Sequence, residues 1–133
     1  PLCGVRLLIV EDEPDAREML VEILGQCGAQ TRAVATAAEA LESLRQWNPD
    51  LLLSDIEMPG EDGYSLIRKV RSLDVEQGGQ VPAVALTAHA RLEDRVRALS
   101  AGFQSHIAKP VNANELVAVI GSLARRRRNT PFG

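Results

Sequence analysis

Short apolar runs alternate along the chain with stretches in which apolar residues recur at helical spacing. The runs cover residues 7–10, 31–35, 51–53, 81–86 and 106–108. The first, third and fourth are nearly continuous in Leu, Ile, Val and Ala, which is typical of strands buried on both faces of a parallel sheet. The pattern therefore predicts five strands.

Five amphipathic stretches predict five helices. The first begins at Pro14, where the missing N–H does no harm, and stops at Gly28. Thr36 and Glu39 are spaced as a capping box at the start of the second, and Gly102 ends the fourth. The expected apolar faces are, in order, Ala16, Met19, Leu20, Ile23, Leu24 and Cys27; Ala37, Ala40, Leu41 and Leu44; Leu66, Ile67, Val70 and Leu73; Leu92, Val96 and Leu99; and Leu116, Val119, Ile120 and Leu123.

Strand and helix thus alternate five times. This alternation indicates an α/β fold, in which right-handed crossovers place helices on both faces of one parallel sheet. Residues 74–80 contain Gly78-Gly79 and are expected to form a loop. No segment is left over for a second domain, and no internal repeat is visible.

The composition excludes several classes of protein. Of 133 residues, 45% are hydrophobic and 25% are charged, which is ordinary for a globular domain and excludes disorder as the main state. No apolar run approaches the roughly 18 residues of a membrane span, and no signal peptide is visible. Cys3 and Cys27 are too few for a disulfide scaffold and match no metal motif, so we expect a reducing, cytoplasmic setting in which Cys27 is a small buried hydrophobe.

Charge is distributed unevenly. The formal net charge is −3, but the run 125–128 supplies four of the 15 basic residues, so the rest of the chain carries 11 basic against 18 acidic residues, or −7. An acidic body argues against a nucleic-acid surface and favours a cation or a basic partner. We interpret the run as a solvated helix end or linker, with a role at a nucleic acid or membrane surface as the alternative.

Chemically useful side chains follow the predicted strands. Ligands of open α/β sheets bind beyond the carboxyl ends of the strands, at a switch in strand order. The residues that follow the first, third, fourth and fifth runs are Glu11, Asp12 and Glu13; Ser54 and Asp55; Thr87 and Ala88; and Lys109 and Pro110.

Asp55 carries the strongest signal in this group. It ends a Leu run and precedes a Met-Pro-Gly turn, so it should be partly buried and should need Lys109 or a cation as its partner. Ordinary explanations exist for its neighbours, since Asp12 or Glu13 could cap the next helix and Thr87 could be a plain strand residue. The combination is more specific than any one member.

Grouped carboxylates repel one another, and a divalent cation relieves the repulsion. Mg²⁺ prefers oxygen ligands and is usually held by one or two carboxylates together with phosphate oxygens. An aspartate is ionised at neutral pH and needs no general base to act as a nucleophile. Phosphoryl transfer requires alignment and charge neutralisation, which a metal, an ammonium and a hydroxyl group supply. This edge therefore supports formation of a phosphoaspartate.

Four motifs in this order resemble the receiver domain of two-component response regulators. The resemblance covers about residues 5–124, nearly the whole chain. The motifs are Leu8-Ile9-Val10-Glu11-Asp12-Glu13, Ser54-Asp55-Ile56-Glu57-Met58-Pro59-Gly60-Glu61-Asp62-Gly63, Leu86-Thr87-Ala88 and Ala108-Lys109-Pro110.

The resemblance implies a flavodoxin-like, doubly wound sheet of strand order 2-1-3-4-5. It also implies that a sensor histidine kinase or a histidine phosphotransfer domain phosphorylates Asp55 with Mg²⁺ as the cofactor. Asp12 and Asp55 would bind the metal directly, Glu11 directly or through water, and Glu57 through its backbone carbonyl.

The same resemblance implies roles for two more residues at the catalytic edge. Lys109 would contact the phosphoryl group. Thr87 would turn toward it and switch the face formed by the fourth helix, fifth strand and fifth helix, which is a two-state element biased by a local change of charge.

Some positions depart from the commonest receiver pattern. The first acidic position is Glu11 rather than Asp, and the switch position holds His106 where Tyr or Phe is frequent. Glu57 and His89 match positions that tune hydrolysis of the acyl phosphate, in a direction that the sequence does not give. The two histidines lack metal-ligand spacing, so we expect no transition-metal site.

The ends of the chain favour a receiver taken from a hybrid sensor histidine kinase. Residues 1–4, which lack an initial Met, are interpreted as a lead-in linker, residues 5–124 as the receiver, and residues 125–133 as a basic tail. The pattern over residues 101–110 also resembles hybrid kinases, and a stand-alone or effector-linked regulator is the alternative. We expect a cytoplasmic domain that contacts neither nucleic acid nor membrane, even if the parent chain is membrane-associated. A homodimer through the fourth and fifth helices is allowed but not determined.

Other functions fit less well. A haloacid-dehalogenase-like phosphatase would need a second Asp where this chain has Glu57. A flavodoxin-like cofactor binder would need a phosphate loop of Gly, Ser and Thr in place of Glu-Asp-Glu. A degenerate receiver that only binds proteins is the remaining alternative, although all five chemical positions are filled. Whether the chain is an enzyme stays open, since a receiver catalyses its own aspartyl phosphorylation and dephosphorylation and the parent chain could be a kinase.

Overall fold

Five parallel strands form a single sheet in a computed structural model that describes residues 1–89 and 91–129, with side chains up to residue 126. The strand order is β2-β1-β3-β4-β5, so the expected fold is confirmed. The chain leaves β1 first toward one edge and then toward the other, which places a switch point between β1 and β3. The strands are β1 (Arg6–Val10), β2 (Gln30–Val34), β3 (Leu51–Asp55), β4 (Ala83–Thr87) and β5 (Ser105–Ala108).

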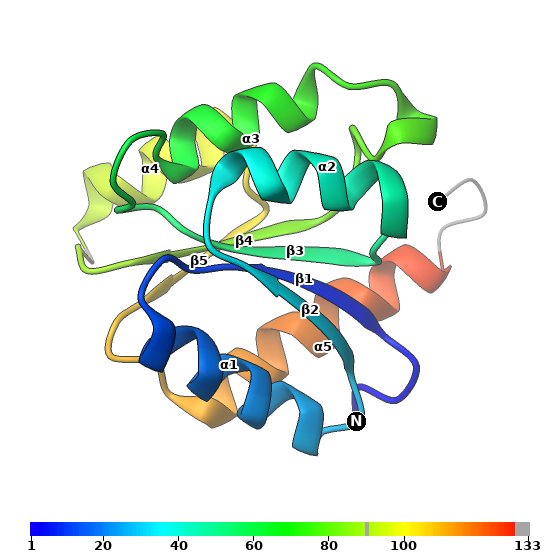
Figure 1. The fold of residues 1–133 in the computed structure, drawn as a ribbon. Helices are drawn as coiled ribbons and strands as arrows, with labels where there is room; N and C mark the ends of the chain where they lie inside the picture. Colours follow the sequence, from blue (N-terminus) through cyan, green and yellow to red (C-terminus); the bar gives the residue numbers. More distant parts are fainter. Residues whose placement is uncertain (90, 130–133) are drawn as a thin grey trace.

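Helices cover both faces of the sheet (Figure 1). One face carries α1 (Pro14–Gln26) and α5 (Ala113–Asn129). The other carries α2 (Ala37–Trp47), α3 (Gly63–Arg71) and α4 (Leu92–Ala101). A short 3-10 helix, η1 (Val75–Gln77), lies in the predicted loop after α3.

Two apolar cores, one on each face, hold the central strands. Alternate residues of β1, β3 and β4 point to opposite sides, so each strand contributes to both cores. Leu8 and Leu52 pack beneath α2 and α3, whereas Leu7 and Leu53 pack against α1 and α5. Because these strands are buried on both faces, their carboxyl ends are fixed relative to one another.

Side-chain caps set where the helices begin. The Glu13 carboxylate accepts hydrogen bonds from the backbone N–H groups of Asp15 and Ala16 at 3.2 and 2.6 Å. Glu13, not Asp12, is therefore the cap of α1, which leaves the Asp12 carboxylate for other chemistry. The Thr36 hydroxyl accepts from the Glu39 N–H at 3.2 Å, as the predicted cap of α2 requires.

The expected apolar face of α4 is wrong in direction. Leu92, Val96 and Leu99 are 74, 52 and 42% exposed, and Ala98 is the buried residue of this helix. Spacing identifies a stripe but not the side that faces the core, and here the small Ala98 side chain allows close approach to the sheet. Met19 of α1, also expected to face inward, is 44% exposed.

The N-terminal end of the chain packs on the domain. Leu2 is fully buried, and its N–H donates to the Cys27 carbonyl at 2.9 Å, while Cys27 itself is half-buried. Helix α5 continues beyond residue 124 to Asn129. Among the described residues, the helices are too short or too polar to cross a membrane.

Candidate functional site

Three carboxylates meet at the carboxyl edge of the sheet. Glu11 and Asp12 follow β1 and Asp55 ends β3, and one carboxylate oxygen of each lies within 4.8 Å of the others. Glu11 and Asp55 are each 2% exposed, and Asp12 is half-buried. The structure therefore brings together the acidic residues that the sequence placed after the first and third strands.

Backbone pairing fixes this arrangement. Val10 of β1 is in register with Ser54 of β3, so the residues that follow Val10 lie beside Asp55. The turn after Asp55 is closed by Met58 and Gly63, whose N–H groups both donate to the Ile56 carbonyl, at 3.1 and 2.9 Å.

Gly63 allows this turn to pack tightly. A Cβ at this position would lie only 2.5 Å from the Asp55 carbonyl oxygen and 2.8 Å from the Ile56 Cα atom. The Asp-Gly end of the motif is therefore needed partly for packing, because any larger residue would displace the end of β3.

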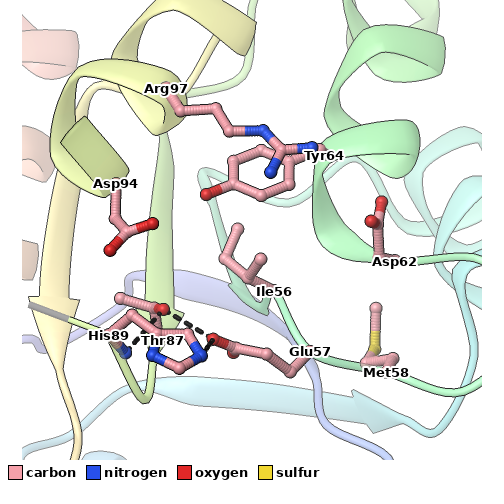
Figure 2. A pocket seen from close by; sticks show the side chains of 9 residues that line it. All are labelled: Ile56, Glu57, Met58, Asp62, Tyr64, Thr87, His89, Asp94 and Arg97. Carbon is pink, nitrogen blue, oxygen red and sulfur yellow. Dashed lines mark hydrogen bonds and ion pairs between the residues drawn. The ribbon is translucent and has the colours of Figure 1, made fainter.

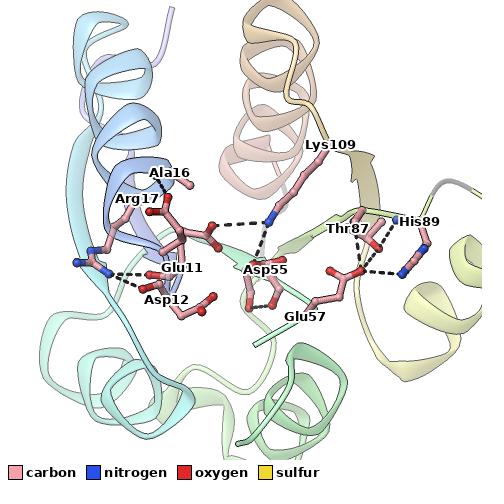
Figure 3. A network of polar contacts seen from close by, with 12 residues as sticks. Glu11, Asp12, Ala16, Arg17, Asp55, Glu57, Thr87, His89 and Lys109 are labelled. Carbon is pink, nitrogen blue, oxygen red and sulfur yellow. Dashed lines mark hydrogen bonds and ion pairs between the residues drawn. The ribbon is translucent and has the colours of Figure 1, made fainter. Parts of the chain in front are cut away.

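The Lys109 ammonium lies between the two buried carboxylates (Figure 3). Its Nζ atom is 3.0 Å from Asp55 Oδ2 and 3.6 Å from Glu11 Oε1. Burial lowers the pKa of Lys109, but the hydrogen bond and charge of Asp55 and the charge of Glu11 outweigh burial and leave the pKa above its usual value. The lysine is thus a permanent cation in this site.

One lysine does not balance the acidic cluster. Burial, followed by the hydrogen bond and charge of Asp55, raises the pKa of Glu11 to about 8, although Lys109 acts in the opposite direction. At neutral pH the Glu11 carboxyl group therefore tends to retain its proton. Glu11 Oε2 and Asp55 Oδ1 are buried and have no hydrogen-bond partner among the described residues.

These properties fit a divalent cation. Two unpaired, buried carboxylate oxygens and a third, half-buried carboxylate form the all-oxygen ligand set that Mg²⁺ prefers, and a cation would remove the repulsion that now retains a proton on Glu11. The acidic cluster could therefore bind a metal ion.

A second polar group lies beside Asp55, at the end of β4 (Figure 3). The buried Thr87 hydroxyl donates to Glu57 Oε1 at 2.7 Å, and the Ala88 N–H donates to the same oxygen at 3.2 Å. Thr87 Oγ1 accepts in turn from the His89 N–H at 3.1 Å, and His89 Nε2 is 3.9 Å from Glu57 Oε1. The family resemblance implied that Glu57 binds the metal through its backbone carbonyl and affects hydrolysis, but this side-chain contact was not predicted.

Glu57 also borders a hollow of about 320 Å³ between α3 and α4 (Figure 2). The Arg97 guanidinium lies 4.0 Å from the centre of the Tyr64 ring, which joins α4 to α3. His106 lies outside this group, on β5 and in register with Ala85, with its buried Nε2 lacking a hydrogen-bond partner among the described residues.

Comparison with known proteins gives a consistent result. The family model described as "Response regulator receiver domain" matches residues 7–121. The chain is 38% identical over 122 residues to the two-component response regulator PhoP of Pseudomonas aeruginosa, covering 92% of this chain and 52% of PhoP. It is 36% identical over 124 residues to the sensor histidine kinase RcsC of Salmonella typhi, covering 93% of this chain but 13% of RcsC. The chain thus spans about half of one relative and a small part of the other.

Solved structures agree with these relatives. The receiver domain of the sensor histidine kinase PA1611 of Pseudomonas aeruginosa superposes with a TM-score of 0.83 at 33% identity, covering 92% of this chain and 99% of that one. That structure has a magnesium ion coordinated in its active-site cleft.

Proposed function

Because this chain belongs to the response regulator receiver domain family and is a receiver domain of two-component systems, we propose that it accepts a phosphoryl group on Asp55 from a phosphohistidine. The observation that supports this most strongly is the state of Asp55 itself. Its carboxylate is buried at the end of β3, one oxygen contacts the Lys109 ammonium at 3.0 Å, and the other has no partner among the described residues.

The transfer step follows from these contacts. An Asp55 carboxylate oxygen forms a bond to phosphorus while the P–N bond of the donor breaks, and the imidazole leaves with the electron pair of that bond. Lys109 neutralises charge on the phosphoryl oxygens and holds Asp55 in the orientation needed for attack. The burial of Asp55 limits access of bulk water to the new acyl phosphate.

Mg²⁺ is the proposed cofactor. The carboxylates of Glu11, Asp12 and Asp55 and the backbone carbonyl of Glu57 would hold it, and when bound it neutralises negative charge on the transferring phosphoryl group. The magnesium ion of the PA1611 receiver supports the same assignment.

We propose that Thr87 and His106 carry the conformational change that follows phosphorylation. Thr87 would turn toward the phosphoryl group, and His106 would follow it on the face formed by α4, β5 and α5. The exposed stripe of α4 gives that face apolar surface for a partner. Glu57 and His89 would tune hydrolysis of the acyl phosphate.

The larger context is also part of the proposal. The similarity to the RcsC sensor kinase and the PA1611 receiver supports a hybrid sensor histidine kinase as the parent chain, with residues 5–124 as its receiver, residues 1–4 as a lead-in and residues 125–133 as a basic tail. The partner would be a histidine kinase or histidine phosphotransfer domain, and the site would face the cytoplasm.

The test is transfer from a purified, radiolabelled histidine phosphotransfer domain. With Mg²⁺ the label should move to this protein, and Asp55→Asn should abolish the transfer. Asp62→Asn is the matched control, because Asp62 lies in the same motif but caps α3 through the Ser65 N–H at 2.9 Å. Transfer to the Asp55→Asn protein would contradict the proposal. So would a wild-type protein that accepts no phosphoryl group from any phosphohistidine donor.

A further inference from the structure

Two hydrogen-bond donors at the end of β4 converge on one carboxylate oxygen. The Thr87 hydroxyl and the Ala88 N–H both donate to Glu57 Oε1, at 2.7 and 3.2 Å. Glu57 lies two residues beyond Asp55, in the loop that follows β3. Because Asp55 is in register with Leu86 of β4, this loop lies beside the end of β4. A carboxylate therefore already occupies both of these donors at the end of β4.

We propose that Glu57 is a positioning residue whose carboxylate takes the place of the phosphoryl group on Thr87 and Ala88 until Asp55 is phosphorylated. This inference rests on the proposed function and adds a competition between two anions for the same two donors. Phosphorylation can recruit Thr87 only after the contact with Glu57 has broken. Glu57 thereby opposes phosphorylation and favours the resting position of Thr87.

The contact is strong enough to matter. Hydrogen bonds to a charged acceptor are shorter and about twice as strong as neutral ones, and the Thr87–Glu57 distance of 2.7 Å lies in the charge-assisted range. Thr87 is buried, and its oxygen also accepts from the His89 N–H at 3.1 Å, so its donor and one of its two acceptor positions are used. Thr87 must therefore break its hydrogen bond to Glu57 before its hydroxyl can donate to a phosphoryl group.

Glu57 has a route away from Thr87. Its side chain is 37% exposed and borders the hollow of about 320 Å³ beside α4 (Figure 2). His89 Nε2, 3.9 Å from Glu57 Oε1 in the resting state, offers a neighbouring contact on the same side. The carboxylate can therefore leave the buried hydroxyl without moving into the core.

The first experiment compares rates of phosphorylation by acetyl phosphate with Mg²⁺. Glu57→Ala should raise the rate about tenfold, since a hydrogen bond to a charged group contributes on this order. Glu57→Gln keeps an acceptor oxygen without the charge and should give a smaller increase. Asp94→Asn is the matched control, because Asp94 also lines the hollow but has no hydrogen bond to Thr87 among the described contacts.

A double-mutant cycle separates the hydrogen bond from plain charge repulsion. In a Thr87→Ala background the rate is expected to be lower throughout, and Glu57→Ala should raise it much less than in the presence of the Thr87 hydroxyl, because only the Ala88 N–H contact remains to be released. Equal increases with and without the Thr87 hydroxyl would overturn the proposal, because Glu57 would then act only through its charge.

A structural signal makes the test independent of phosphorylation. In the unphosphorylated protein, the Ala88 amide should lose its carboxylate partner in Glu57→Ala, so its proton resonance should move upfield and exchange faster with water, but not in Asp94→Asn. An unchanged Ala88 resonance overturns the inference whether or not Asp55 is labelled. If acetyl phosphate fails to label the wild type, the proposed function is contradicted instead. The Ala88 resonance still tests the contact between Glu57 and Ala88 in that case.

Discussion

Replacing Lys109 by Met should destabilise the protein, because it removes the ammonium that neutralises the acidic cluster. Lys69 and Lys109 are the chain's two lysines, and Lys109 alone contacts the buried carboxylates of Asp55 and Glu11. Met retains much of the aliphatic length of lysine but removes the ammonium. The substitution therefore tests charge rather than packing.

The size of the effect follows from burial. Removing one partner of a buried ion pair destabilises by about 3–5 kcal/mol. Lys109 is 31% exposed, which weakens the interaction, and the raised pKa of Glu11 allows the carboxyl groups to retain a proton once the lysine is gone. We therefore expect a loss of about 2 kcal/mol at pH 8.5, or roughly 6–10 °C in Tm for a chain of this size, and a smaller loss at pH 6.

The assay is urea and thermal unfolding with EDTA and with Mg²⁺. The control is Lys69→Met, because Lys69 pairs with Glu61 at 2.6 Å on the surface, where an ion pair contributes at most about 1 kcal/mol. Mg²⁺ should stabilise Lys109→Met more than the wild type, since the metal neutralises the same oxygens. The reasoning is refuted if both lysine variants lose equal stability in EDTA, or if Mg²⁺ leaves the Lys109 variant unchanged.

Three further predictions concern stability. The pKa of Glu11 in the folded protein is raised from 4.5 to about 8, so the folded protein binds more protons than the unfolded protein over this range. The free energy of unfolding without metal should therefore fall as the pH rises from about 4.5 to 8. Urea unfolding of Glu11→Gln should show a flatter dependence on pH. Gly63→Ala should destabilise the protein by about 1–3 kcal/mol, because the added methyl group would overlap the end of β3. Gly25→Ala is the control, because it has open space in α1 and should stabilise by about 0.5–1 kcal/mol. A Gly63→Ala protein as stable as the wild type in calorimetry would contradict the packing argument. The Arg71 guanidinium donates to three backbone carbonyls and one side-chain amide. In calorimetry, Arg71→Ala should therefore lower the stability by about 3 kcal/mol, and Arg68→Ala, at an exposed position, by less than about 0.5 kcal/mol. Equal losses in the two variants would refute this role of Arg71.

The strands and the acidic edge were predictable because both depend on local pattern and topology. Continuous apolar runs at 7–10 and 51–53 require burial on both faces, and parallel strands bring their carboxyl ends to one edge. These two facts place Asp12, Asp55 and Lys109 at one edge of the sheet, whereas the strand order that sets how close they lie came from the family resemblance.

Side-chain orientation was not predictable in the same way. The stripe Leu92, Val96 and Leu99 has the spacing of a core face, yet the sheet is approached by Ala98, and a periodic pattern holds no information on which partner covers it. The contact between Glu57 and Thr87 joins loops 30 residues apart and depends on rotamers, so no spacing along the chain could reveal it.

The central claim is that Asp55 is the phosphoacceptor, and mapping the modified residue tests it most directly. The protein is treated with acetyl phosphate and Mg²⁺, the acyl phosphate is reduced with borohydride, and the peptides are sequenced by mass spectrometry. The account predicts one modified position, Asp55, that is absent with EDTA and in Asp55→Asn. Modification of another carboxylate, or a label that persists in Asp55→Asn, would contradict it.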